Sequence, residues 1–127
     1  YQDPSSGTWY QVTDQGAREG NYLESSATAL FIYTLAKAIN KGYIGNEYIE
    51  PTQKAFDGMV KTFTRLEEDG SYTITNCCAV AELGGDSKRY RDGSFEYYIS
   101  EPIIENDPKS VGSFILAAIE YEKMTKK

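Results

Sequence analysis

The sequence predicts a mostly helical fold in which about three helices are joined by long polar loops that carry minor β structure. Three observations support this fold class: two segments are apolar on nearly every side, a third has one apolar stripe, and cap residues or Pro and Gly flank all three. The chain has 127 residues, which is enough for one core of modest size. We therefore expect residues 1–127 to form a single unit.

The first predicted helix follows the loop-like residues 1–24. Ser25 or Ser26 is the expected N-cap, and Gly42 marks the C-terminal stop. A helix that is apolar around most of its circumference needs packing partners on more than one face. The apolar residues that predict it are Ala27, Leu30, Phe31, Ile32, Leu35, Ala36 and Ile39.

The second predicted helix begins near Pro51, extends to about Leu66 and is closed by Gly70. Its apolar side chains form one stripe, so one face covers a core and the other faces water. The stripe consists of Ala55, Phe56, Met59, Val60, Phe63 and Leu66. Residues 71–75 then alternate as a short strand does, with Tyr72 and Ile74 on one face.

The third predicted helix has Asp107 as its N-cap and Pro108 at its first position. Like the first, it is apolar nearly all round, and we expect its charged end, residues 120–127, to fray. The preceding non-helical passage, residues 76–107, is longer than loops usually are unless they serve a site.

The three helices are expected to run up, down and up, because the first connection is short. The first and third helices then begin at the same end of the layer, where both long polar segments also lie. Two positive helix-dipole ends facing one groove favour an anionic ligand, such as a sugar acid.

Composition excludes several function classes. The net charge of -6 argues against a nucleic-acid surface and against an anionic membrane surface. The sequence has no His and no metal-ligand spacing, and no apolar run reaches the roughly 20 residues of a membrane span.

Adjacent Cys77 and Cys78 are interpreted as buried small hydrophobes rather than as a redox pair. Because the chain does not begin with Met, we expect a piece of something larger or a processed product.

Two groups of residues are candidates for ligand binding. Trp9 could stack on a sugar ring that Gln11 hydrogen-bonds, or Trp9 could pack as core beneath the long loop. Arg91, Asp92, Tyr97 and Tyr98 could bind sugar hydroxyls or a carboxylate, Arg91 through its bidentate guanidinium. Alternatively, Arg91 and Asp92 pair with each other or with Glu96 and brace the loop.

Lys109 is a further candidate, because a cation in the first turn of a helix opposes the helix dipole. This local conflict suggests a role in function, and we expect Lys109 to face a pocket and contact substrate. Glu24, Glu96 and Glu101 are possible members of the acid pair that glycoside hydrolysis commonly uses, but their spacing does not support one.

Several of these motifs resemble the C-terminal part of the unsaturated rhamnogalacturonyl hydrolases, glycoside hydrolase family 105. They are residues 7–12 (GTWYQV), 21–26 (NYLESS), 90–102 (YRDGSFEYYISEP) and 106–112 (NDPKSVG), together with Asp14, Tyr33 and Lys37. The unsaturated glucuronyl hydrolases are a more distant match. Ser110 departs from the Gly that the family pattern has at that position.

The resemblance implies an (α/α)6 barrel, with the first and third helices inner and the second outer. It also implies removal of an unsaturated uronic acid from pectin-derived oligosaccharides, by hydration of the sugar's double bond and without a metal or organic cofactor. The family's proton-donating Asp and its His residues belong to the part N-terminal to this segment. We therefore expect the C-terminal third of such an enzyme, with no catalytic residue of its own and no activity alone.

The expected partners are the unsaturated oligosaccharide and either the rest of the barrel or further copies of this chain, in a homo-oligomer. No nucleic acid or membrane partner is expected, and a bacterial cytoplasmic or periplasmic location is the expectation. The alternative function is a non-catalytic helical module that binds sugar or assembles with protein. A helical-repeat scaffold is less favoured, because the sequence has no internal period.

Overall fold

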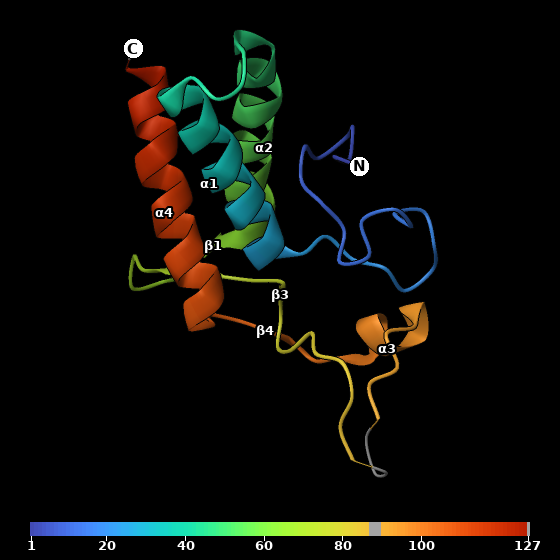
Figure 1. Ribbon diagram of the computed structural model, residues 1–127. Helices are drawn as coiled ribbons and strands as arrows, with labels where there is room; N and C mark the ends of the chain where they lie inside the picture. Colours follow the sequence, from blue (N-terminus) through green and yellow to red (C-terminus); the bar gives the residue numbers. More distant parts are fainter. Residues whose placement is uncertain (87–89, 127) are drawn as a thin grey trace.

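The structure, a computed structural model, describes residues 1–86 and 90–126 (Figure 1). The long helices are α1 (Ser25–Lys41), α2 (Ile49–Phe63) and α4 (Pro108–Thr125). The short helices are a 3-10 turn (Asn46–Tyr48) and α3 (Phe95–Ser100). Strand β1 (Thr64–Leu66) pairs with β2 (Tyr72–Ile74), and β3 (Cys77–Cys78) pairs with β4 (Ile103–Ile104), both antiparallel. The predicted mostly helical class with minor β structure is confirmed.

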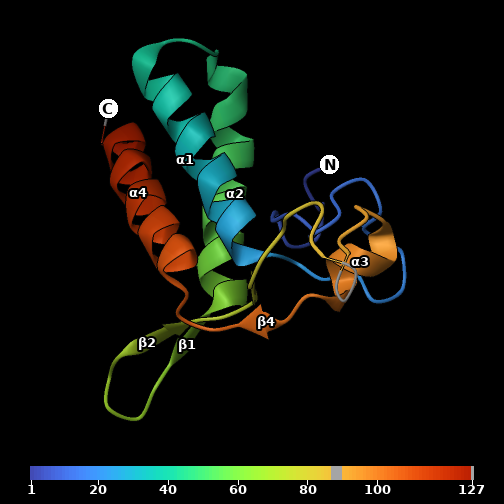
Figure 2. The same cartoon turned by 60° about the horizontal axis from the view of Figure 1, so that its bottom comes forward.

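The three long helices form one layer that runs up, down and up, as predicted (Figures 1 and 2). Helices α1 and α4 begin at the same end, where the hydroxyl oxygens of Ser25 and Ser110 lie 3.3 Å apart. Toward the other end, the Asn40 side-chain amide donates to the Glu120 carbonyl at 2.9 Å. The parallel pair α1 and α4 is therefore in contact along its length, with α2 antiparallel beside it.

The core lies where the three helices meet. It consists of the buried residues Ala29, Ile32, Ala55, Met59, Phe63 and Ala117, with Trp9, Leu23, Tyr33, Phe56 and Phe114 packed around them. Gly58 permits the N-terminal segment to cross α2, because a Cβ there would lie 1.8 Å from the Ser6 carbonyl oxygen. Residues 1–8 are thereby held against α2.

The predicted N-cap of α1 is wrong by one or two residues. Glu24, rather than Ser25 or Ser26, caps the helix, and its carboxylate accepts from the Ala27 backbone N–H at 2.7 Å. Ser25 is fully buried against α4 and is already helical. The predicted C-terminal stop is confirmed, because Gly42 adopts φ +71°.

The predicted end of the second helix is also wrong. Helix α2 stops at Phe63, and residues 64–66 form β1, in which Leu66 pairs with Tyr72. Gly70, with φ +83°, lies in the hairpin turn rather than at a helix end (Figure 2). The helical period continues through Leu66, so periodicity could not separate the strand from the helix. In β2, Tyr72 is exposed and Thr73 is buried.

Two more corrections concern the C-terminal third of the chain. Helix α3, which Ser94 caps by accepting from the Tyr97 N–H, interrupts the passage predicted to be non-helical. Helix α4 continues through Thr125 instead of fraying from residue 120. Tyr121 stacks on Phe56 with ring centroids 3.8 Å apart, and Met124 is buried, so packing holds this last stretch.

Within the described part of the chain, no helix is both long and apolar enough to cross a membrane.

Candidate functional site

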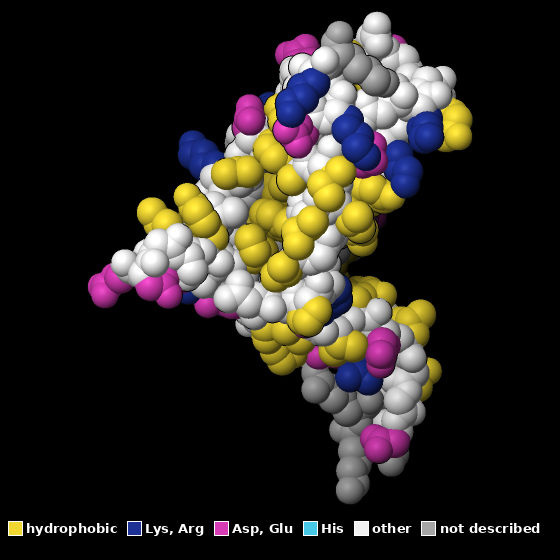
Figure 3. All heavy atoms as spheres, turned by 90° about the vertical axis from the view of Figure 1, so that its left-hand side faces the viewer, with side chains coloured by type: hydrophobic (Ala, Val, Ile, Leu, Met, Phe, Trp, Pro, Cys, Tyr) yellow, Lys and Arg dark blue, Asp and Glu magenta, His cyan; other side chains and the backbone are white. Residues whose placement is uncertain are grey.

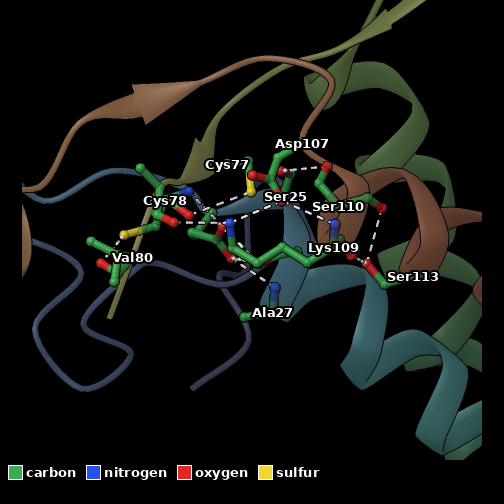
Figure 4. Close-up of polar contacts among 12 residues, drawn as sticks. Ser25, Ala27, Cys77, Cys78, Val80, Asp107, Lys109, Ser110 and Ser113 are labelled. Carbon is green, nitrogen blue, oxygen red and sulfur yellow. Dashed lines mark hydrogen bonds and ion pairs between the residues drawn. The ribbon is translucent and has the colours of Figure 1, made fainter. Parts of the chain in front are cut away.

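The candidate site lies at the shared starting end of α1 and α4, beside Cys77 and Cys78 of β3 (Figure 4). We call this region the helix-start junction and define it by Glu24, Ser25, Asp107, Lys109 and Ser110. Ser25 and Ser110 are fully buried in it. Small serine side chains let the two helices approach closely here.

Glu24 is the buried centre of the helix-start junction, with 1 % of its surface exposed. Its carboxylate accepts from the Ala27 N–H at 2.7 Å, from the Cys78 N–H at 2.9 Å and from the Ser26 hydroxyl at 2.9 Å. One carboxylate thus caps α1 and fixes β3 above it. Each oxygen is hydrogen-bonded, as a buried carboxylate requires.

Lys109 projects from the first turn of α4 and keeps 47 % of its side chain exposed. Its ammonium lies 2.9 Å from the Asp107 carboxylate and donates to the Ala79 carbonyl at 3.1 Å. Partial burial acts to lower the pKa of Lys109, but the hydrogen bond and charge of Asp107, together with the neighbouring Cys77, outweigh it and the pKa is raised. Lys109 therefore stays charged, and Asp107 offsets the conflict with the helix dipole.

The two helix starts are less open to an anion than the sequence suggested. Glu24 accepts from the Ala27 N–H at the start of α1, and Asp107 accepts from the Lys109 N–H at 2.9 Å at the start of α4. These carboxylates offset the positive ends of both dipoles. Attraction for an anionic ligand at the helix-start junction consequently depends on the Lys109 ammonium.

Trp9 and Gln11 lie beside the helix-start junction. Trp9 packs against the core, with its ring edge-on to Phe31 at a centroid distance of 5.0 Å. The Gln11 amide donates to the Cys78 sulfur at 3.2 Å. Both residues are half-buried, so each presents part of its surface to solvent.

Tyr22 and the two cysteines lie next to Gln11. The Tyr22 hydroxyl is buried with no well-formed hydrogen bond among the described residues, and burial, with Cys78 and Glu24 nearby, raises the pKa of Tyr22. Cys77 and Cys78 are buried free thiols, as predicted. Burial first, and then the charge of Glu24, raises the pKa of Cys77. Cys77 is therefore held as a neutral thiol rather than a nucleophile.

Arg91 braces the loop, but with other partners than the sequence suggested. Its Nε donates to the buried Glu101 carboxylate at 3.0 Å, and its guanidinium lies 3.6 Å from Glu82. Asp92 instead accepts from the Ser94 N–H at 2.9 Å. The hydrogen bond to Glu101 raises the pKa of Arg91. The side chain remains 21 % exposed and is held rigidly for any ligand that reaches it.

Tyr97 and Tyr98 lie on α3 with ring centroids 4.8 Å apart. Tyr97 is buried, and its hydroxyl accepts from the Glu82 N–H at 2.9 Å. Tyr98 is half-buried. Glu96 forms an ion pair with Arg18, whose guanidinium lies 3.8 Å from the centre of the Phe95 ring. The Arg18 contacts attach α3 to the N-terminal loop, and the Tyr97 hydroxyl attaches it to Glu82.

The six candidate residues thus form two groups. Gln11 and Lys109 contact β3 and the residue after it, and Trp9 donates its backbone N–H to Thr28 on α1. Arg91, Tyr97 and Tyr98 instead cluster at α3, farther from the long helices (Figure 1). Three open depressions on the surface lie elsewhere and are lined by none of the six. One lies beside α2 near Ser6, and two lie at the opposite end of α1 near Lys37 and Lys41.

Sequence reasoning missed the two buried carboxylates that organise this region. The sequence offers Glu24 and Glu101 only as possible members of an acid pair, yet Glu24 caps α1 and Glu101 holds Arg91. The available signal for Glu24 was its place directly before a predicted helix start. Glu101 gave no local signal, because its partner is ten residues away. No group of three or more His, Cys, Asp or Glu suited to a metal ion occurs in the described residues.

Comparison with known proteins decides the family. The family model of Glycosyl Hydrolase Family 88 matches residues 1–125. The chain belongs to glycosyl hydrolase family 88. Protein Atu3128 of Agrobacterium fabrum is 36% identical over 119 residues, which cover 91% of this chain and 51% of that protein. The 24.9 kDa protein in the picA locus of Rhizobium radiobacter matches equally. This family 88 chain thus spans about half the length of these curated relatives.

Solved structures confirm the resemblance to family 105 and the (α/α)-barrel fold class. A glycoside hydrolase from family 105 of C. acetobutylicum ATCC 824 is 45% identical, with a TM-score of 0.91 over 95% of this chain and 33% of its own. A possible member of that family from Klebsiella pneumoniae is 27% identical, with a TM-score of 0.73 over 98% of this chain and 28% of its own. The family 88 chain therefore corresponds to about a third of these enzymes.

Proposed function

We propose that this chain supplies the C-terminal third of a glycoside hydrolase that removes unsaturated uronic acid from pectin-derived rhamnogalacturonan oligosaccharides. The observation that carries the proposal is the 45% identity, at a TM-score of 0.91, to a family 105 glycoside hydrolase over nearly the whole chain. The resemblance of residues 90–102 and 106–112 to the unsaturated rhamnogalacturonyl hydrolases supplies the substrate class.

The proposed reaction is hydration of the carbon-carbon double bond of the terminal sugar. An Asp carried by the remainder of the enzyme gives its proton to one carbon, and a water adds to the other after losing a proton to the enzyme. The hydrated sugar is a hemiketal, so its ring opens and the glycosidic linkage breaks. No step requires a metal ion or an organic cofactor.

The residues of this chain bind and orient the substrate in this scheme. The charged Lys109 ammonium, partly exposed at the helix-start junction, attracts the carboxylate of the uronic acid. Trp9 offers an aromatic edge and Gln11 an amide beside it. Arg91 and Tyr98, held at α3, contact the sugars next along the oligosaccharide.

The decisive experiment measures loss of the ultraviolet absorbance of the conjugated double bond. We expect no turnover of an unsaturated galacturonyl-rhamnose disaccharide by the purified 127-residue chain. The complete enzyme that contains this segment should act on it, and should act less well on an unsaturated glucuronyl-hexosamine disaccharide. Turnover by the chain alone, or a preference of the complete enzyme for the second substrate, would contradict the proposal.

A second experiment tests individual residues by substitution in the complete enzyme. Lys109→Ala and Tyr98→Phe should raise KM while Tyr97→Phe, which removes a hydroxyl bonded to the loop backbone, should act mainly on stability. Unchanged KM and turnover in Lys109→Ala and Tyr98→Phe would mean that these residues serve only as scaffold.

A non-catalytic sugar-binding or assembly module is the second candidate. Three acids that could have formed a catalytic pair have structural partners instead, and this favours the second candidate. Glu24 caps α1, Glu96 pairs with Arg18, and Glu101 pairs with Arg91. Titration calorimetry of the isolated chain with the same disaccharide separates the two. If the isolated chain binds the disaccharide and no larger protein that contains it turns the disaccharide over, the module is supported.

A further inference from the structure

Two adjoining depressions lie toward the C-terminal ends of α1 and α4, at the opposite end of the helical layer from the helix-start junction. Their volumes are about 660 and 300 Å³, within the range of sites that bind small molecules. Lys37 and Lys41 line both depressions. We call the two together the lysine–tyrosine groove and define it by Tyr33, Lys37, Lys41, Tyr43, Lys123 and Lys126.

The lysine–tyrosine groove is positively charged, although the whole chain carries a net charge of -6. Figure 3 shows Lys and Arg side chains gathered at this upper end of the molecule, beyond a band of hydrophobic ones. Lys123 pairs with Glu120, and Lys126 pairs with Glu122. The Lys37 ammonium donates to the Tyr33 hydroxyl instead of to a carboxylate. Four ammonium groups thus have two carboxylate partners among the described residues, which leaves a surplus of positive charge.

The helix dipoles explain only part of this charge. Cations are favoured in the last turn of a helix, and Lys41 and Lys123 lie in the last turns of α1 and α4. Lys37 lies one turn earlier, with its ammonium 4.8 Å from the centre of the Tyr33 ring. Offsetting the dipoles therefore does not account for Lys37, which is one of the residues that match the family motifs.

Tyr43 adds an exposed aromatic ring on a fixed backbone. It follows Gly42, and its N–H donates to the Ala38 carbonyl at 2.9 Å, which closes the C-terminal end of α1. The ring itself is not used for packing, because Tyr43 is 79 % exposed. An aromatic face that is held in place and open to water is suited to stacking on a sugar ring.

Charged side chains keep this end of the helices in water. Lys is almost never fully buried unless it is paired. Lys123 and Lys126 keep 58 % and 71 % of their side chains exposed even though each has a carboxylate partner. The lysine–tyrosine groove should therefore stay open to solvent in a larger protein that contains this chain.

We propose that the lysine–tyrosine groove is a second carbohydrate-binding site, which holds an anionic oligosaccharide of saturated uronic acid residues. Ammonium groups on two parallel helices pair with the carboxylates that recur along such an oligosaccharide. Tyr43 stacks on one of its rings. A nucleic acid fits less well, because its longer backbone would also meet the acidic remainder of the chain. Binding here involves no double bond, so the proposal does not depend on the proposed function.

The test titrates this chain with trigalacturonate, which has no double bond and is not consumed by the proposed reaction. Calorimetry gives the Kd, and nuclear magnetic resonance of the backbone amides locates the site. Lys41→Glu should weaken binding by about tenfold or more, and Tyr43→Ala by about threefold or more. Lys61→Ala, which removes an exposed lysine of α2 outside the groove, is the matched control and should leave the Kd unchanged.

Two further ligands separate charge from sugar. The trimethyl ester of trigalacturonate keeps the rings and hydroxyls but loses the charges, and should bind about tenfold more weakly or worse. A triaspartate peptide keeps three carboxylates without the rings, and should bind more weakly than trigalacturonate and be insensitive to Tyr43→Ala. Triaspartate binding as tight as that of trigalacturonate would overturn the assignment to a sugar. No binding of trigalacturonate, or binding that Lys109→Ala removes and Lys41→Glu does not, would overturn the site.

The same titration of the complete enzyme that contains this segment tests whether the groove stays open there. We expect Lys41→Glu to weaken trigalacturonate binding in that protein as well, and an unchanged Kd would overturn the proposal. Hydrolysis is a separate readout. Failure of the complete enzyme to hydrolyse the unsaturated disaccharide would count against the proposed function and leave the second site in place.

Discussion

Two regions of this chain are held together by different forces. The helical layer of α1, α2 and α4 is built on buried apolar side chains such as Ile32, Met59 and Phe63. The loop layer (residues 1–24, 76–86 and 90–107) is tied by polar contacts, including those of the buried acids Glu24 and Glu101. The difference teaches that the scaffold depends on burial, whereas the candidate site depends on a few charged hydrogen bonds.

The largest expected effect comes from the helical layer. Phe63→Ala should lower the free energy of unfolding by about 3 to 5 kcal/mol, because it removes a fully buried ring from the meeting point of the helices. Urea unfolding followed by far-ultraviolet circular dichroism measures it. Val60→Ala, on the same helix but 43 % exposed, is the control and should change stability by about 0.5 kcal/mol or less. Equal losses would mean that burial does not hold the layer.

A smaller effect is expected at the contact between the two layers. Glu24→Ala should cost about 2 to 4 kcal/mol, because it removes the α1 cap and leaves the buried Cys78 N–H without its acceptor. Glu24→Gln keeps an acceptor oxygen and should lose less. Thermal unfolding of both variants gives the comparison. If Glu24→Gln were as damaging as Glu24→Ala, the charge rather than the hydrogen bonds would connect the layers.

The smallest expected effect is a difference between the loop layer and the helical layer in the pH at which acid disrupts them. In the loop layer, hydrogen bonds from Ser94 lower the pKa of Asp92, and hydrogen bonds from Lys109 lower the pKa of Asp107. The charged forms of these two carboxylates stabilise the folded state at any pH above the ordinary Asp pKa of about 4. This stabilisation is lost as the pH falls through their lower pKa values in the folded state. The pKa values of Glu120 and Glu122, in the last turns of α4, are lowered as well. We therefore expect acid to fray that end of α4 and to loosen the loop layer before the buried helical core opens.

Trp9 makes this order measurable, because it is the single Trp and belongs to the loop layer. Its fluorescence should change at a higher pH than the far-ultraviolet circular dichroism of the helices. Asp107→Asn, which removes one titrating group, should narrow the gap between the two transitions. Coincident transitions in the unsubstituted chain would show that the two layers unfold as one.

Local sequence signals determined most of the helical layer. Gly42 ends α1 and Asp107 caps α4, as predicted, because both act through backbone conformation within a few residues. The all-round apolar character of α1 and α4 and the single stripe of α2 predicted which helices need further neighbours. Motif resemblance supplied the family, which composition and periodicity alone could not.

Only the tertiary structure decided the end of α2, the short helix α3 and the partners of the charged loop residues. Residues 64–66 continue the helical period, but pairing with Tyr72–Ile74 makes them a strand. Arg91 pairs with Glu101 rather than with its neighbour Asp92, and Glu24 reaches a backbone N–H 54 residues away. Contacts over such separations depend on how the helices pack, so no local pattern encodes them. For this reason the sequence by itself determined the helical scaffold and the family, and the packing of the chain decided the geometry of the site.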